Sequence, residues 1–169
     1  MEKQEFASIS LYLKGRMRLL TDKDEPPRFS GFGLSDSASD VEELTNSHTP
    51  EAMVSFLLNM NAKLDAILSH LKHDQLEVDF PDPVEILELS GSALTIKNTK
   101  KLTTGTHIEL LVFLSDFPLS VAGACGQVAN VDEETATIEF SRISAEDREK
   151  IVHHVFVEER RQIRTQRLA

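Results

Sequence analysis

The chain has 169 residues, of which 40% are hydrophobic, so it is long enough for one cored domain with an accessory element. Its formal net charge of −10 disfavours nucleic-acid binding, because phosphate neutralisation requires positive charge. The single cysteine, Cys125, excludes an internal disulfide and a cysteine-based zinc site, and we expect it to be a small buried strand residue.

The hydropathy of the chain predicts no membrane insertion. No apolar run approaches the roughly 20 residues that are needed to cross a bilayer. The charged segment 1–5 is not followed by the apolar core of a signal peptide. We therefore expect a soluble, cytoplasmic protein.

The first element predicted is a strand over residues 6–20, because apolar and polar residues alternate with a period of two. The apolar face comprises Ile9, Leu11, Leu13, Met17 and Leu19. The other face comprises Tyr12, Lys14, Arg16 and Arg18. We expect the two arginines to be solvated, with contact to a ligand as the alternative.

Residues 21–48 are predicted to form a flexible linker. Residues 22–48 combine Pro26-Pro27 with glycines, several serines and many acidic residues, a composition typical of linkers and disordered loops.

A helix is predicted over residues 49–75, with Thr49 as N-cap, Pro50 at the first helical position and Glu51 in the first turn. Its apolar residues recur at the 4-3-4 spacing of a heptad seam, formed by Met53, Leu57, Met60, Leu64, Ile67 and Leu71. Leucine at the a positions favours four strands over two, so we expect a homo-oligomer, in particular a tetramer. The alternative is an amphipathic helix that packs on its own domain.

Five short strands are then predicted at residues 83–90, 93–98, 106–114, 119–131 and 135–142. A second helix is predicted at 145–165, with Ser144 as its cap. Six closely spaced strands favour a small barrel, so the predicted fold class is α+β. The predicted division is a first strand (1–20), the linker (21–48), an oligomerising helix (49–75), the rest of the barrel (76–143) and a C-terminal helix (144–169).

The motifs of common enzymes are missing from the sequence, which holds no nucleophile elbow, phosphate loop or His-Glu-x-x-His pair. His70 and His73 could share a helical face, but they have no third ligand, so we expect them to be solvated and predict no metal site. We therefore predict a non-enzymatic protein with no required cofactor.

Three segments together resemble the PilZ family of cyclic di-GMP receptors: residues 3–8 (KQEFAS), 88–93 (ELSGSA) and 143–151 (ISAEDREKI). The resemblance is strongest to the atypical, tetramer-forming PilZ proteins, which insert a long helix after the first strand. It implies a six-stranded barrel with this inserted helix and a terminal helix. It also implies a nucleotide site made of an Arg-x-x-x-Arg motif and an Asp/Asn-x-Ser-x-x-Gly motif.

The sequence departs from both motifs. Gln4 and Ser8 stand where the resemblance implies arginines, and Lys3 beside them offers only a flexible point charge. Glu88 replaces Asp/Asn, Ser90 is retained, and Ala93 replaces Gly. Each lost arginine removes a charged hydrogen bond worth about 1.5–3 kcal/mol, so we expect cyclic di-GMP to bind weakly or not at all.

The resulting prediction is an oligomeric signalling adaptor in cyclic di-GMP pathways that acts on an unidentified signalling protein. Two alternatives remain. One is a functional receptor that binds cyclic di-GMP where the N-terminal segment meets the barrel. The other is a structural oligomeric scaffold.

Overall fold

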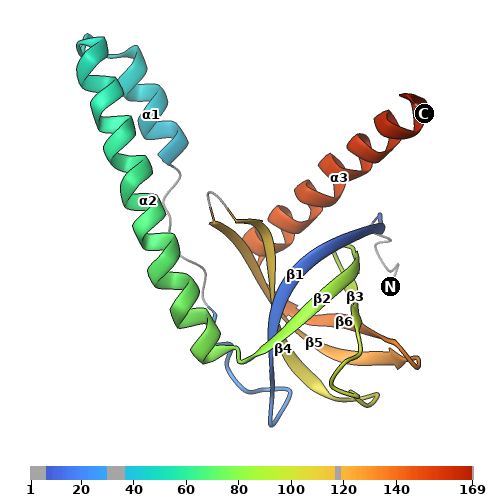
Figure 1. The fold of residues 1–169 in the computed structure, drawn as a ribbon. Helices are drawn as coiled ribbons and strands as arrows, with labels where there is room; N and C mark the ends of the chain where they lie inside the picture. Colours follow the sequence, from blue (N-terminus) through green and yellow to red (C-terminus); the bar gives the residue numbers. More distant parts are fainter. Residues whose placement is uncertain (1–6, 30–36, 117–118, 169) are drawn as a thin grey trace.

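The computed structural model describes residues 7–29, 37–116 and 119–168. Six strands form a barrel, and two long helices leave this barrel on different sides (Figure 1). Residues Lys3 and Gln4 of the predicted nucleotide site lie outside the described residues.

The six strands form one closed antiparallel sheet in the order β1-β2-β3-β6-β5-β4, with β4 pairing back to β1. The strands are β1 (Ile9–Leu19), β2 (Asp82–Leu89), β3 (Ala93–Lys97), β4 (His107–Asp116), β5 (Leu119–Val131) and β6 (Thr135–Ile143). The α+β fold class and the six-stranded barrel predicted from the sequence are confirmed.

The interior of the barrel is filled by alternate residues of every strand, such as Met17, Ile86, Leu110 and Ile138. Helix α3 (Ala145–Leu168) adds Ile151 and Val155, which are buried in the same cluster. Ser144 caps α3 as predicted, because its hydroxyl accepts a hydrogen bond from the backbone N–H of Asp147 at 3.0 Å. The rest of α3 projects beyond the barrel (Figure 1).

The 62 residues between β1 and β2 contain two helices that run side by side as a hairpin, α1 (Ser37–Asn46) and α2 (Glu51–Asp79) (Figure 1). We call this hairpin the arm. The prediction of a flexible linker therefore missed α1, which lies against α2 and whose only large apolar residues are Val41 and Leu44. A helix of ten residues has little stability of its own. Thr49 is not the N-cap: that position is held by Pro50, with no side-chain hydrogen bond.

A second hydrophobic cluster lies on the outer face of β4 and β5, under the base of α2. It joins Leu76 and Phe80 at the end of the helix to Leu111, Phe113 and Val121 of the barrel. β4 is therefore buried on both faces, which explains its almost uninterrupted run of apolar residues. This cluster fixes the base of the arm on the barrel.

Candidate functional site

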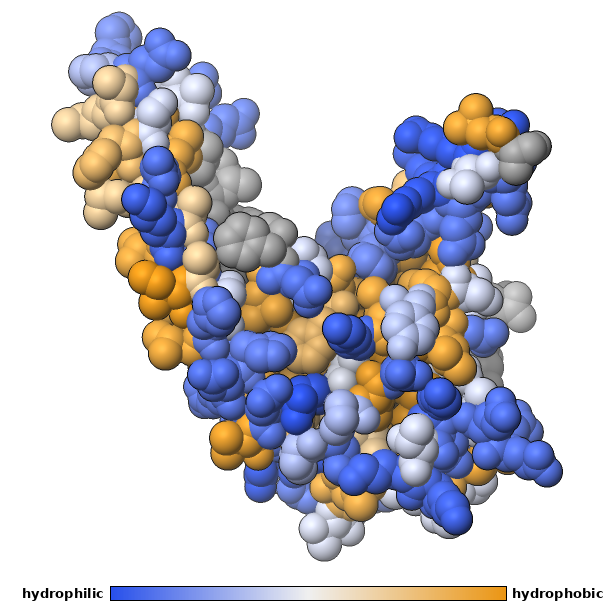
Figure 2. Space-filling view, viewed as in Figure 1, coloured by the Kyte–Doolittle hydropathy of each residue, from blue (hydrophilic) through white to orange (hydrophobic). Residues whose placement is uncertain are grey.

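The predicted heptad seam of α2 is exposed along its length. The exposed fractions of its side chains range from 39% to 63%, for Met53, Leu57, Met60, Leu64, Ile67 and Leu71. Figure 2 shows apolar surface along the side of α2 that faces away from the barrel. The alternative that this face packs on its own barrel is therefore wrong, and the seam is available to a partner.

The exposed seam extends further than the sequence prediction. Val78 follows Leu71 by one heptad and is 79% exposed, which lengthens the seam beyond the predicted residues. Phe56 and Leu68, which the heptad pattern itself places at the flanking g and e positions, widen the apolar face and are 64% and 41% exposed. The predicted helix end at residue 75 was four residues short. Contiguous apolar surface of this kind on a projecting helix is typical of a protein–protein interface.

Arg16 of β1 holds the base of the arm. Its Nε donates to the carbonyl oxygen of Phe80 at 2.6 Å, and its Nη2 donates to that of Pro81 at 3.2 Å. Its Nη1 lies 3.3 Å from Oε1 of Glu77. The guanidinium thus binds the junction of α2 and β2, and the prediction of a solvated Arg16 is wrong.

Arg18, two residues further along the same face of β1, is also not solvated. Its side chain is 6% exposed, and its Nε donates to Oε2 of Glu109 at 2.6 Å. Its Nη1 donates to Oε1 of Glu25 at 2.6 Å and its Nη2 to the carbonyl of Pro26 at 3.1 Å. A buried guanidinium needs such partners, because transferring an unpaired charge out of water is costly.

Residues 20–29, which we call the strap, leave β1 and cross the outer face of the barrel. Glu109 accepts hydrogen bonds from the backbone N–H groups of Arg28 at 3.1 Å and Phe29 at 2.9 Å. Arg142 of β6 donates to the carbonyl of Glu25 at 2.6 Å. The segment between β1 and β2 is therefore held at its start by Arg18 and at its end by Arg16.

The charges of this network shift the pKa values of two groups. Burial opposes the charged form of Arg18, but its hydrogen bonds to Glu25 and Glu109 outweigh this and raise its pKa. The hydrogen bond from Arg18 lowers the pKa of Glu25, as does the bond from the backbone N–H of Thr21. The strap is thus held in part by the ion pair between Arg18 and Glu25, and the lowered pKa keeps the carboxyl group of Glu25 ionised.

Ser90, the retained residue of the second motif, shapes the turn between β2 and β3. Its hydroxyl accepts from the N–H of Ala93 at 3.1 Å and donates to the carbonyl of Ala93 at 3.0 Å. Ser90 is 6% exposed. These bonds give Ser90 a structural role that requires no ligand.

The other described motif residues are less constrained. Ser8 is exposed just before β1, and Glu88 is exposed on β2, where it accepts a 3.5 Å hydrogen bond from Thr95. Ala93 pairs with Glu139 of β6. Its backbone is outside the left-handed region, which among the described residues holds only Lys101 and Gly105. Alanine is therefore accommodated without strain at this position.

The remaining candidate residues from the sequence are the two histidines of α2 and Cys125. No group of three or more potential ligands in the described part of the chain could hold a metal ion. His73 is exposed as predicted, with 51% of its side chain accessible, and one side of its ring lies near Phe113 with centroids 5.8 Å apart. Cys125 is buried as predicted, and burial raises the pKa of its thiol. Among the described helices, none has the length and apolarity to cross a bilayer.

Comparison with solved structures identifies the architecture. A Xanthomonas campestris protein, described as a tetrameric PilZ domain self-assembled via a helical bundle, is 20% identical with a TM-score of 0.59, covering 95% of this chain and 92% of that one. The chain has the PilZ fold. The Bacillus subtilis inhibitor of motility MotI/DgrA is 10% identical with a TM-score of 0.50, covering 97% of this chain and 53% of that one. No family model and no curated protein matches the chain.

Within this PilZ fold, the residues that sequence reasoning missed lie in the network around Glu109. Glu109 is 1% exposed in the middle of an apolar strand. A carboxylate in a run such as Ile-Glu-Leu-Leu-Val-Phe (residues 108–113) signals a buried charge that needs a cationic partner. That signal indicates the pairing, but it does not say which arginine provides it.

Proposed function

We propose that this chain is a non-enzymatic, cytoplasmic adaptor of cyclic di-GMP signalling that self-associates through α2. The observation that supports this most directly is the exposed seam of a 29-residue helix projecting from a PilZ-type barrel. A helix of this length with an unpaired apolar face is stabilised when a partner covers the face. The Xanthomonas protein with the same fold is described as self-assembling via a helical bundle.

The proposed assembly is a homotetramer. The α2 helices of the four chains pack together through the seam. Each arm carries one barrel at its base, so the assembly displays several barrels at once. Multiple barrels raise the avidity for a signalling protein that binds each one weakly. Because Arg16 and the outer cluster fix the base of α2, the assembly presents its barrels at a defined orientation.

Weak or absent binding of cyclic di-GMP is the second part of the proposal. Gln4 and Ser8 replace the two arginines that the PilZ resemblance implies, and Ser90 is engaged in its own turn. Two charge-assisted bonds lost together reduce affinity by about 100- to 10,000-fold. Isothermal titration of the full chain should show no saturable binding of cyclic di-GMP up to about 100 μM. A dissociation constant of a few micromolar would support the receptor alternative instead.

Self-association is tested by placing charge in the seam. L57E/L64E puts two carboxylates where leucines face the partner helices, so we expect the oligomer to dissociate into monomers. N59E/A62E adds the same two negative charges at exposed residues of α2 outside the seam and should remain oligomeric. Sedimentation velocity at equal chain concentration distinguishes the two. Identical sedimentation of L57E/L64E and the wild type would contradict this interface.

A further inference from the structure

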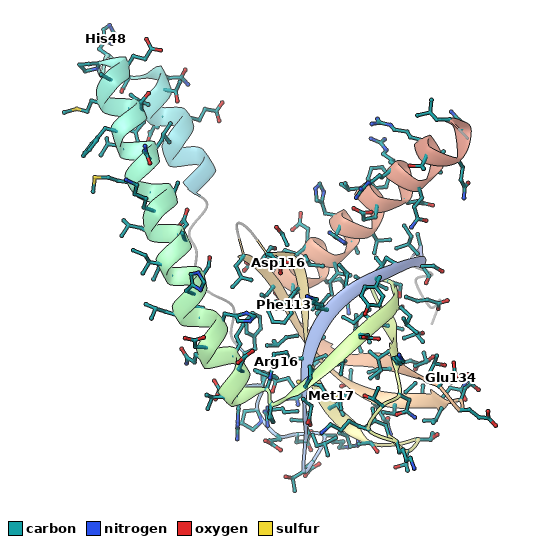
Figure 3. All side chains as sticks on the ribbon, in the orientation of Figure 1. Arg16, Met17, His48, Phe113, Asp116 and Glu134 are labelled. Carbon is teal, nitrogen blue, oxygen red and sulfur yellow. The ribbon has the colours of Figure 1, made fainter. Side chains whose placement is uncertain are left out.

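Residues 156–168 of α3, which we call its outer half, project beyond the barrel. The inner half is anchored by Ile151 and Val155, which are buried in the barrel core. In the outer half, Gln162 donates from Nε2 to the carbonyl oxygen of Ser10 at 2.8 Å, which fixes the side of the helix that faces the barrel. Figure 3 shows the side chains of the outer half extending clear of the barrel. The arm leaves the barrel on a different side, so self-association through the seam leaves this surface free.

The outer half of α3 is basic, although the protein is acidic. Four arginines and no aspartate or glutamate occur between residues 160 and 169, whereas the net charge of the chain is −10. Cations in the last turn of a helix stabilise its dipole, but only Arg167 lies in the last turn of α3. The dipole therefore does not account for the whole cluster, which comprises Arg160, Arg161, Arg164 and Arg167.

Most of this positive charge is not neutralised by the described part of the chain. Arg164 and Arg167 form no ion pair with any described residue. Nη1 of Arg161 lies 3.6 Å from Oε1 of Glu158, but the side chain of Arg161 is 77% exposed, so water and salt screen the pair. The arginine cluster is therefore available to an anionic surface.

Exposed apolar side chains share this surface with the arginines. Phe156 and Ile163 are 49% and 44% exposed, and at 3.6 residues per turn they lie about 20° apart around the helix axis. Arg160 and Arg167 lie within about 40° of Phe156 around the same axis, and Cζ of Arg160 is 4.4 Å from the centroid of the Phe156 ring. Arg160 is about 160° from Gln162, so this surface faces away from the barrel. A partner that covers the apolar residues therefore also contacts the arginines.

A bilayer that contains anionic lipids matches this combination of charge and apolar surface. A basic helix with exposed apolar residues lies in the plane of the bilayer interface, where its cations contact lipid phosphates and its apolar side chains enter the headgroup region. The acidic remainder of the protein is repelled by such a surface, but this repulsion decays within about 8 Å at physiological ionic strength. Because the outer half of α3 projects, it can reach the bilayer while the barrel stays further away (Figure 1).

We propose that the outer half of α3 docks on the surface of a membrane that contains anionic lipids. The arginines bind lipid phosphates, and Phe156 and Ile163 enter the interface between the headgroups and the acyl chains. A partner bound by charge alone, such as a nucleic acid, would leave these two apolar side chains in water. Docking adds a membrane location to the adaptor function proposed above and does not depend on that function.

Co-sedimentation of the full chain with lipid vesicles tests the charged part of this surface. Phosphatidylcholine vesicles with about one third phosphatidylglycerol should bind the protein, and vesicles of phosphatidylcholine alone should not. R164Q/R167Q should reduce the partition coefficient at least about tenfold, because each basic residue near an anionic surface contributes about a factor of five. The matched control K23Q/K101Q removes two cations from exposed residues outside α3 and should stay within about twofold of the wild type.

F156S/I163S tests the apolar part of the surface and keeps all four arginines. It should reduce the partition coefficient at least about fivefold, because two side chains lose their burial in the interface. Three results would overturn the proposal: no binding to the anionic vesicles, equal binding to phosphatidylcholine alone, or wild-type binding by R164Q/R167Q. Wild-type binding by F156S/I163S would also overturn it and would assign the arginines to a partner recognised by charge alone. None of these substitutions changes the seam, so the comparison holds with or without a tetramer.

Discussion

The guanidinium of Arg18 donates from Nε to Oε2 of Glu109 across 2.6 Å, and the two side chains are 6% and 1% exposed. The partners lie on the neighbouring strands β1 and β4, where Arg18 and Glu109 are directly paired. The same carboxylate accepts the N–H groups of Arg28 and Phe29. One buried ion pair therefore joins two strands of the barrel to the strap from which the arm begins.

Removing the cation of this pair is expected to destabilise the fold strongly. R18M leaves the carboxylate of Glu109 buried without its guanidinium, which costs about 3–5 kcal/mol. R18M/E109Q replaces the unpaired carboxylate with a neutral amide whose oxygen can still accept hydrogen bonds from the strap. This variant should therefore recover part of the lost free energy of unfolding. Urea unfolding at fixed chain concentration measures both. R18M within 1 kcal/mol of the wild type would contradict this role.

The ion pair between Arg18 and Glu25 makes the strap sensitive to acid. The pKa of Glu25 is lowered in the folded protein, so its contribution is fully present above the unfolded value of 4.5. That contribution is lost as the pH falls through the lowered folded pKa. The wild type should therefore exceed E25Q in unfolding free energy at pH 7, and the difference should shrink as the pH falls from 5 to 3. A difference that stays constant over this range would show that the charge of Glu25 is not involved.

Phe29 closes the strap against Gly123 of β5. A Cβ at Gly123 would overlap Cδ1 of Phe29 and lie 3.0 Å from its Cε1, so a larger residue must displace the ring. We expect G123A to lose about 1–3 kcal/mol, as is usual for overpacked sites. In the background F29A the same change should cost much less, because the clash is gone. A double-mutant cycle from thermal unfolding gives the coupling, and strictly additive effects would argue against this contact.

Arg16 is expected to control the mobility of the arm at its base. R16M removes the donors to the carbonyl oxygens of Phe80 and Pro81. K14M changes the neighbouring outward residue, which makes neither of these bonds, and serves as the control. The amide of Phe80, bonded to the carbonyl of Leu76 at 2.8 Å, should exchange faster in R16M. Hydrogen exchange read by mass spectrometry measures it. Equal exchange in R16M and K14M would contradict the role of Arg16.

The barrel and the seam could be predicted because both rest on periodic patterns. Alternation in β1 and β6 and the heptad of α2 depend only on local residue order, and the strands and helices appear where these patterns place them. α1 was missed because its ten residues hold only two large apolar residues and lie within a segment rich in proline, glycine, serine and acidic residues. Its position depends on contact with α2, which sequence periodicity does not encode.

The roles of Arg16 and Arg18 could not be read from β1 alone. Alternation correctly placed both on the outer face of the strand, and outer residues of a barrel are usually solvated. The strap and the base of α2 cover that face, so these residues are buried by segments distant in sequence. At the end of the strand the pattern also failed for Leu19, which was predicted to lie on the apolar face but is 56% exposed.

The molar mass of the wild-type chain in solution tests the central claim, that the seam of α2 joins copies of the protein. Multi-angle light scattering at micromolar concentration should give four times the 18.9 kDa of one chain. A mass of 18.9 kDa that stays constant across that concentration range would contradict self-association and the adaptor function built on it.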